Sequence, residues 1–345
     1  MNFRNLTSVG YEGVAVRVPL RISFAGGGTD VDPYRSQFGG AVLTVTIQTY
    51  VHASIWKAPS ELATVTSLDM GQVLNYDANT EASVLNQTLL SACLAEIPSS
   101  FRQGINLTVR STVPPGSGLG ASSAVAISLT QAINVYLKRG LNLNQIADLA
   151  YDIERNRVGI KGGMQDHYAC AAGGIRLIEF FKNGLIESKH LELPIDFVLE
   201  LESNLLLFWT GQNRLDRNII ADQSRRVAQG STLQATHAQA KLVSSMHDAF
   251  LGTDLFSIGE HLRQGWELKK KMSPLISSEA IDRMYSAGLK AGALGGKLLG
   301  AGGGGFILFL TSRQSRQNVV DEMRTLGLVE YPVAFDLEGP KTWII

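Results

Sequence analysis

PPGSGLGASSA, at Pro114–Ala124, is a glycine- and serine-rich loop between two segments of different periodicity. GINLTVRSTV (104–113) before it alternates like a strand, and AVAISLTQAINVYL (124–137) after it is apolar almost all round, like a buried helix. The glycines let the backbone approach a ligand closely, and the N–H groups that open the helix would face an anion there. The pattern predicts a phosphate-binding loop, with a flexible turn and a serine helix cap as the simpler alternative.

Two better-known nucleotide-binding motifs fit the sequence poorly. The spacing of Gly116, Gly118 and Ala121 agrees with the dinucleotide-binding fingerprint, but that motif needs a strand ending in an acidic residue about twenty residues later. Here a second helix-like segment follows instead. The P-loop pattern comes nearest at ALGGKLL, where Ala291 replaces its first glycine and Leu298 replaces the Ser/Thr that would hold magnesium.

The composition is that of an ordinary globular protein. The chain has 345 residues, 45% of them hydrophobic, which suggests two domains with ample core. Its 31 lysines and arginines balance 31 aspartates and glutamates, so neither a nucleic-acid nor a membrane partner is expected. The 2 cysteines indicate neither a disulfide framework nor a zinc site, and no signal-peptide pattern occurs. We expect a cytoplasmic protein; its oligomeric state, a homodimer included, stays open.

The sequence has two further glycine clusters, AGGGTD (25–30) and GAGGGG (300–305). Strand-like patterns flank the first of them. Val14–Phe24 is apolar at every even position, which places Arg17, Arg21 and Ser23 together on the opposite face. Pro19 within it indicates an edge strand or a local break. A second strand is predicted over 41–55.

The remaining chain mixes helices and strands. LNQIADLAYDIERNRV (143–158) has helical spacing, with Asn142 or Asn144 as its cap and Glu154 beside the apolar stripe. Near the end, 329–335 alternates like a strand. Mixed elements without strict alternation favour an α+β protein in two domains, which we place at 1–194 and 195–345.

Three motifs together resemble the small-molecule kinases named for galactose, homoserine, mevalonate and phosphomevalonate, the GHMP kinases. They are RVPLRISFAGGGTD, PPGSGLGASSA and KLLGAGGGGFILFL, which follow the family's order and cover nearly the whole chain. SFAGGGTDVDPY, GGMQDHYACAAGG and ALGGKLLGAGGGGF look most like bacterial D-glycero-D-manno-heptose 7-phosphate kinases. The resemblance implies a two-domain α+β fold, with an N-terminal ATP-binding domain and a C-terminal ferredoxin-like domain.

The resemblance also implies roles for individual residues. Asp166 matches the aspartate that contacts the phosphoryl-accepting hydroxyl, and Arg21 a cation near the transferred group, although Arg17 shares its strand face. Ser122 and Glu154 match a magnesium-holding pair. The residues expected to bind ATP are Pro115, Gly116, Ser117, Gly118, Leu119, Gly120, Ala121, Ser122 and Ser123. Those expected to bind the acceptor are Gly27, Gly28, Thr29, Asp30, Gly303 and Gly304, with Arg214 and Arg217 for an acceptor phosphate.

The implied reaction is the ATP- and magnesium-dependent phosphorylation of the anomeric hydroxyl of a sugar phosphate, heptose 7-phosphate, for nucleotide-heptose synthesis. Alternatives are a kinase of a free galactose- or fucose-type sugar, a decarboxylating relative, and a non-catalytic sugar sensor. Met164 and His167 stand where the heptose-kinase pattern commonly carries a lysine and a glutamine, which puts the acceptor in doubt. WELKKKM (266–272) is interpreted as a solvated helix face, although a lysine there could assist a phosphate.

Overall fold

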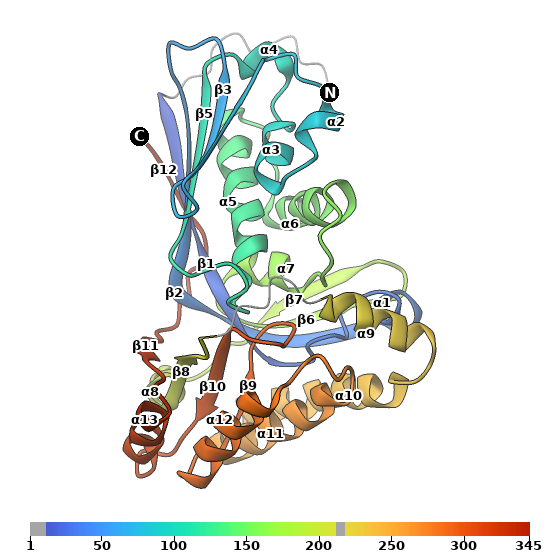
Figure 1. The fold of residues 1–345 in the computed structure, drawn as a ribbon, viewed down its shortest axis with the longest axis vertical. Coiled ribbons are helices and arrows are strands. Elements are labelled where there is room, and N and C mark those ends of the chain that lie inside the picture. Colours follow the sequence, from blue (N-terminus) through green and yellow to red (C-terminus); the bar gives the residue numbers. More distant parts are fainter. Residues whose placement is uncertain (1–11, 212–217) are drawn as a thin grey trace.

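The structure is a computed structural model that describes residues 12–211 and 218–345. Its described residues form two sheets with helices packed on each, one unit above the other in the view of Figure 1. This arrangement confirms the predicted α+β class.

The first sheet is built around one long strand, β2. Its strands are β1 (Gly13–Ala25), β2 (Gly40–Lys57), β3 (Ala63–Ser67), β4 (Gln72–Tyr76), β5 (Ile105–Ser111), β6 (Ile175–Phe180), β7 (Ile186–His190) and β12 (Lys341–Ile344). The order is β12-β1-β2-β5-β3-β4, and β6 joins β2 to β7. β2 pairs with β1 on one side, whereas on the other its first part pairs with β6 and its last part with β5. Only β3 and β5 run parallel among the described pairs.

Helices cover one face of this sheet. They are α1 (Tyr34–Phe38), α2 (Ala82–Leu85), α3 (Leu89–Leu94), α4 (Ser99–Arg102), α5 (Ala121–Tyr136), α6 (Leu143–Tyr151), a π-helical segment (Asp152–Arg157) and α7 (Gln165–Ala172). The predicted buried helix is α5, which packs against β1 and β2 and lies behind α3 and α6 (Figure 1). Asn142 caps α6, because its side chain accepts from Gln145 N–H in a capping box.

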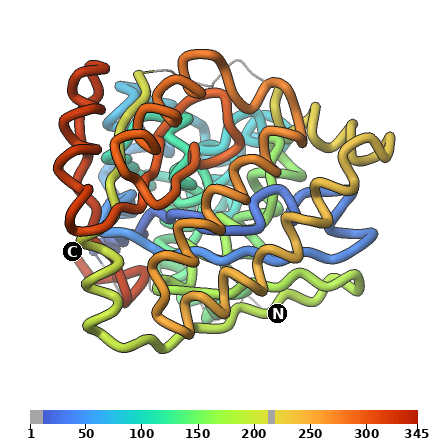
Figure 2. The backbone as a smooth tube through the Cα atoms, turned by 90° about the horizontal axis from the view of Figure 1, so that it is seen from below, coloured from blue at the N-terminus to red at the C-terminus, as the bar shows by residue number. Residues whose placement is uncertain are grey.

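The second sheet has the order β11-β8-β10-β9 and is antiparallel throughout. Its strands are β8 (Leu205–Trp209), β9 (Gly295–Leu298), β10 (Phe306–Leu310) and β11 (Glu330–Tyr331). The accompanying helices are α8 (Ile195–Asn204), α9 (Ile219–Ala228), α10 (Leu233–Leu251), α11 (Leu255–Lys270), α12 (Glu279–Lys290) and α13 (Arg316–Thr325). Figure 2, which views the molecule from below, shows α10 and α11 side by side in front of the first sheet; α10 contacts β1 and β2, and α11 contacts β1.

The two units share a hydrophobic core. Phe24 of β1 meets Phe250 of α10 edge to face, with ring centroids 5.1 Å apart, and Val243 and Met246 belong to the same buried cluster. β1 is therefore buried on both faces, since α5 covers one and the C-terminal helices approach the other.

The end of the chain returns to the first sheet. β12 pairs with Val14–Arg17 of β1, so this strand lies across the boundary proposed at residue 194. Two hydrogen bonds fasten the segment before β12: Asp336 N–H donates to Thr46 O at 2.9 Å, and Thr46 Oγ1 donates to Asp336 O at 2.6 Å. The division into 1–194 and 195–345 stays a proposal. The structure adds that the last strand of the second part, β12, pairs with the sheet of the first.

The local break predicted at Pro19 is confirmed, whereas a second local prediction is wrong. Pro19 marks a register shift in β1, and it lies just beyond the residues that β12 pairs with, so its missing N–H leaves that ladder intact. The strand predicted over 329–335 is wrong in extent: β11 is only two residues long. Pro332 follows it directly and cannot donate to the ladder; the chain then crosses to bridge Ile47 with Phe335.

Within the described ranges, no helix combines the length and apolarity needed to cross a membrane.

The glycine stretches, far apart in sequence, meet in space. Phe306 N–H donates to Ser117 O at 3.0 Å, and Arg21 N–H to Leu119 O at 3.0 Å. A Cβ on Gly118 would lie 2.5 Å from Leu299 O, and Gly118 has φ +86°. Glycine is therefore needed at this position for close packing of protein backbone as well as for its left-handed conformation.

Gly118→Ala should lower the free energy of unfolding by roughly 2–5 kcal/mol, combining left-handed strain with overpacking. The matched control is Gly184→Ala, because Gly184 has nearly the same φ, +85°, but nothing within 4 Å of its Cβ position. That variant should lose only about 1–2 kcal/mol. Equal losses in urea unfolding would show that the close approach to Leu299 carries no cost.

Candidate active site

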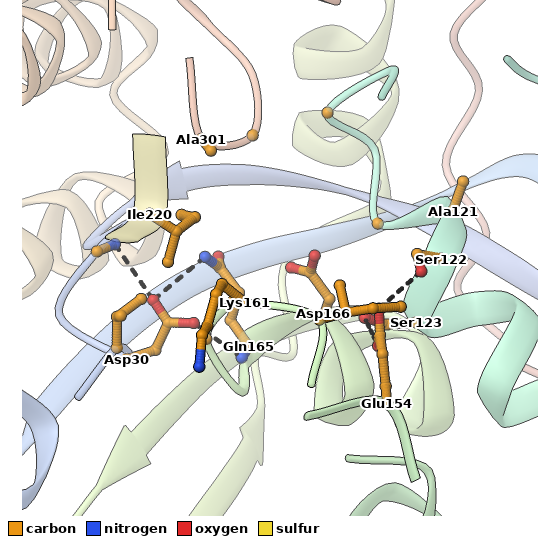
Figure 3. Close-up of a pocket in the computed structure, with 18 of the residues that line it drawn as sticks. Asp30, Ala121, Ser122, Ser123, Glu154, Lys161, Gln165, Asp166, Ile220 and Ala301 are labelled. Atoms are coloured by element: carbon orange, nitrogen blue, oxygen red, sulfur yellow. Dashed lines mark hydrogen bonds between the residues drawn. The ribbon is translucent and has the colours of Figure 1, made fainter. Parts of the chain in front are cut away.

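One cavity collects most of the predicted site residues between the two units. Figure 3 shows Asp30, Asp166 and Glu154 in that order across it, with Ser122 and Ser123 beside Glu154. These residues come from segments widely separated in sequence.

The phosphate loop opens α5 at one side of this cavity. Gly120 precedes the helix in the left-handed conformation, with φ +78°, and the helix begins at Ala121. The first N–H groups of any helix have no carbonyl partner within that helix, so those that open α5 can donate into the cavity. The loop residues that line the cavity are Gly116, Ser117, Gly118, Gly120, Ala121, Ser122 and Ser123. Leu119, by contrast, lies in the hydrophobic core.

Arg21 and Asp166 form a buried pair at the centre. Arg21 Nε donates to Asp166 Oδ1 at 2.8 Å, its Nη2 reaches the same oxygen, and its Nη1 donates to Gly118 O at 2.7 Å. Asp166 lies in the first turn of α7. Arg17 points elsewhere, because its guanidinium lies 4.7 Å from the ring centroid of Tyr50. Of the two arginines on this strand face, Arg21 is the one that reaches the cavity.

Glu154 lies in the π-helical segment and has a fully buried side chain. Ser122 Oγ donates to its Oε1 at 2.7 Å and Ser123 Oγ to its Oε2 at 2.9 Å. Arg155 Nη1 lies 3.1 Å from Oε1 and His167 Nε2 lies 2.7 Å from Oε2. Burial alone would raise the pKa of Glu154, but the charge of Arg155 and these hydrogen bonds lower it to about 2. The carboxylate is therefore ionised at neutral pH.

The residues present fit a magnesium ion that also binds phosphate oxygens. An ionised carboxylate and a serine hydroxyl at the phosphate loop are hard oxygen donors, which magnesium prefers. The described ranges contain no group of three or more His, Cys, Asp or Glu side chains that could hold a metal. Magnesium commonly takes only one or two protein carboxylates and completes its shell with phosphates and water. Glu154 and Ser122 match that incomplete set.

Asp30 stands at the opposite end of the cavity. Its Oδ2 accepts from Gln165 N–H at 3.0 Å and its Oδ1 from Gly28 N–H at 3.2 Å. Burial raises the pKa of Asp30, and the charge of Asp166 adds to the effect. A Cβ on Gly163 would lie 1.8 Å from Asp30 Oδ2, so this carboxylate needs glycine in the GGMQD motif.

Other predicted residues take different positions. Thr29 Oγ1 lies 2.8 Å from the carbonyl oxygens of Gly26 and Ala41, so it holds the loop together. Gly303 N–H donates to Ile276 O at 2.8 Å, and the cavity-lining residues of that motif are Gly300 and Ala301 rather than Gly303 or Gly304. Arg214 and Arg217 lie outside the described residues.

The two departures from the heptose-kinase pattern do not face the acceptor end. His167 is fully buried against Glu154, and its Nδ1 has no hydrogen-bond partner among the described residues. Met164 is also buried, and its N–H donates to Asp30 O at 3.4 Å.

Several lining residues escaped the sequence analysis. They are Lys161, Gln165, Ile220 and Gln223; Lys269, from the WELKKKM stretch in which a lysine could assist a phosphate, lines the cavity as well. A second, largely apolar cavity adjoins the phosphate loop; it shares Gly116, Ala121 and Ser122 with the first and includes Pro115 of the same loop. It is lined further by Met70, Leu89, Leu90, Val109, Val113 and Val125. These residues come from separate strands and helices, so no motif or period could have grouped them.

Comparison with known proteins supports a common family. Residues 85–174 match the family described as GHMP kinases N terminal domain, and residues 246–327 match GHMP kinases C terminal. The chain is 30% identical to the D-glycero-alpha-D-manno-heptose 7-phosphate kinase of Campylobacter jejuni, over 96% of this chain and 99% of that protein. It is 26% identical, over 86% of this chain, to 29% of the bifunctional fucokinase/GDP-fucose pyrophosphorylase of Arabidopsis thaliana.

A solved structure agrees with these matches. The crystal structure of a D-glycero-D-manno-heptose 1-phosphate kinase from Bacteroides thetaiotaomicron superposes with a TM-score of 0.80 at 30% identity, covering 96% of this chain and 99% of that chain.

Glu154→Gln should lower the free energy of unfolding at neutral pH by roughly 2–4 kcal/mol in magnesium-free buffer. The pKa of this carboxyl falls from 4.5 to about 2 on folding, so its ionisation stabilises the folded protein. This stabilisation is complete above pH 4.5 and is lost as the pH falls to about 2. Urea titrations across that range should show the two proteins converging, whereas the exposed control Glu192→Gln should follow the parent throughout. A gap that does not narrow in acid would contradict the assignment.

Proposed function

Because the chain belongs to the GHMP kinase family, we propose that it is an ATP- and magnesium-dependent kinase of a heptose phosphate. The proposed reaction transfers a phosphoryl group from ATP to the anomeric hydroxyl of D-glycero-D-manno-heptose 7-phosphate and yields the 1,7-bisphosphate. The observation that carries this proposal is the Arg21–Asp166 pair, which lies between Asp30 and the phosphate loop.

The nucleotide end is formed by the loop and the apolar cavity. The N–H groups that open α5 and the left-handed glycines before it suit the phosphates of ATP. The adjoining cavity offers apolar side chains such as Leu89, Leu90 and Val125, which suit the flat face of a base. Gly116, Ala121 and Ser122 line both spaces, so one nucleotide can occupy them together.

The transfer centre contains a base and a cation. The hydrogen bonds from Arg21 go to Asp166 Oδ1, and we assign Oδ2 to the acceptor hydroxyl, whose proton it takes as transfer proceeds. Arg21 is in place to stabilise negative charge on the transferred group, because it also donates to the phosphate loop at Gly118 O.

Glu154 and Ser122 are proposed to hold magnesium, which when bound neutralises phosphate charge. Arg155 contacts Oε1 of this carboxylate and His167 contacts Oε2, so the orientation of both oxygens is fixed.

Asp30 is proposed to bind acceptor hydroxyls, with residues 195–345 closing this end through Ile220, Gln223 and Lys269. The relatives differ in their names: one is a heptose 7-phosphate kinase, one a heptose 1-phosphate kinase, and the third includes a fucokinase. A free-sugar anomeric kinase is accordingly the alternative. A sensor without activity is disfavoured, since Asp166, Ser122 and Glu154 are all present and in contact distance of their partners.

A coupled ADP-release assay separates the acceptors. With heptose 7-phosphate, free heptose, fucose and galactose offered in turn, we expect the highest kcat/KM for heptose 7-phosphate and product phosphorylated at the anomeric carbon. A preference for an unphosphorylated sugar would favour the alternative. If none of the sugars raised ADP release above the acceptor-free rate, the sugar-kinase function would be contradicted.

Two aspartate variants separate chemistry from binding. Asp166→Asn should lower kcat by roughly 10²–10⁴-fold with little change in the affinity for ATP, because it removes the proton acceptor. Asp30→Asn should act mainly on the KM of the acceptor, raising it roughly ten- to a hundred-fold. Near-normal kcat in Asp166→Asn would mean that another group accepts the proton.

A further inference from the structure

Lys269 is the buried lysine of WELKKKM, which the sequence analysis interpreted as a solvated helix face. That interpretation is wrong for this side of α11, because Trp266, Lys269 and Met272 are all buried. Lys269 Nζ donates to Gly300 O, and its side chain lines the cavity on the acceptor side with Gln223. An ammonium group is thus held inside the molecule between the GAGGGG motif and the AGGGTD loop.

Gly27 leaves space in front of this ammonium group. A Cβ at Gly27 would lie 3.4 Å from Lys269 Nζ and 3.9 Å from Ser23 Oγ. Ser23 is buried, and its Oγ has no hydrogen-bond partner in the structure. Buried hydroxyls are rarely left unpaired, so an orphaned one beside a charged donor indicates a group that arrives with a ligand.

The surroundings are rich in positive charge. Lys297 Nζ, also buried, donates to Ser23 O at 2.9 Å and Phe24 O at 3.3 Å. Burial lowers the pKa of Lys297 well below its ordinary value, and the charges of Lys269 and Arg21 lower it further. An anion bound beside these three cations would relieve their repulsion.

We propose that Lys269 Nζ and Ser23 Oγ form a phosphate-binding subsite in the space next to Gly27. The subsite rests on the proposed function, because the phosphate it takes is either the one that the acceptor already carries or the one in transfer. Both present phosphoryl oxygens that accept from an ammonium and a hydroxyl. If the subsite takes the acceptor's phosphate, Lys269 determines whether the enzyme uses phosphorylated acceptors; if it takes the transferred group, Lys269 acts on the transfer to every acceptor.

Binding without nucleotide is the first test. Isothermal titration of heptose 7-phosphate and of inorganic phosphate would compare the parent with Lys269→Met, Ser23→Ala and the exposed control Lys271→Met. Lys269→Met should weaken heptose 7-phosphate binding roughly ten- to a hundred-fold, or weaken turnover by the same factor in the kinetic test below. Ser23→Ala should weaken it several-fold at an unchanged or higher melting temperature, since the hydroxyl has no hydrogen-bond partner among the described residues.

Kinetics then identify which phosphate occupies the subsite. If it is the acceptor's own, Lys269→Met raises the KM for heptose 7-phosphate and leaves activity on free heptose as it was. If it is the transferred group, kcat falls on both acceptors while both KM values stay.

The proposal is overturned if Lys269→Met and Ser23→Ala both bind and turn over like Lys271→Met. Should Lys269→Met fail to fold, Ser23→Ala alone decides. Failure of the proposed function has a different signature: the parent would release no ADP with any sugar, whereas the titrations would still separate the variants from the control.

Discussion

The geometry of the site depends on the hydrogen bonds of one buried guanidinium group, that of Arg21. Arg21 is only 2% exposed, so its charge must be balanced inside the protein. It finds a carboxylate on Asp166 and a backbone carbonyl on Gly118, which lie on different segments. Because one rigid planar group satisfies both, the distance between the phosphate loop and the proposed base is set by the size of that group. The strand, the loop and α7 therefore hold one another in place.

Two buried carboxyl groups of the cavity, Glu154 and Asp30, have pKa values that their surroundings shift in opposite directions. Glu154 is surrounded by Arg155, His167 and two serine hydroxyls, which lower its pKa in spite of complete burial. Asp30 accepts only N–H bonds, and burial raises its pKa. These opposite shifts agree with the different roles proposed for the two groups, Glu154 toward a cation and Asp30 toward acceptor hydroxyls.

Sequence patterns predicted the parts of the structure that depend on local order. Alternation placed Arg21 on the face opposite the apolar residues of β1, and spacing identified α5 and the cap at Asn142. They could not predict which residues are buried by segments that are distant in the sequence. Lys269 was assigned to solvent because nothing local shows that α11 is packed against β9 and β1 on that side. Gly118 was expected to make room for a phosphate, yet its missing Cβ faces the backbone of Leu299, a residue from the far end of the chain.

The return of β12 to the first sheet has a consequence for how the protein is made. Val14–Arg17 of β1 are among the first described residues to leave the ribosome, but their partners at 341–344 are among the last. During synthesis this edge of the sheet presents unpaired N–H and C=O groups to any other extended chain nearby. The N-terminal unit can collapse early around α5, but β12 can pair with β1 and complete the sheet only after the C-terminal unit has been translated. A nascent or truncated chain would therefore carry an open strand edge that the finished protein hides.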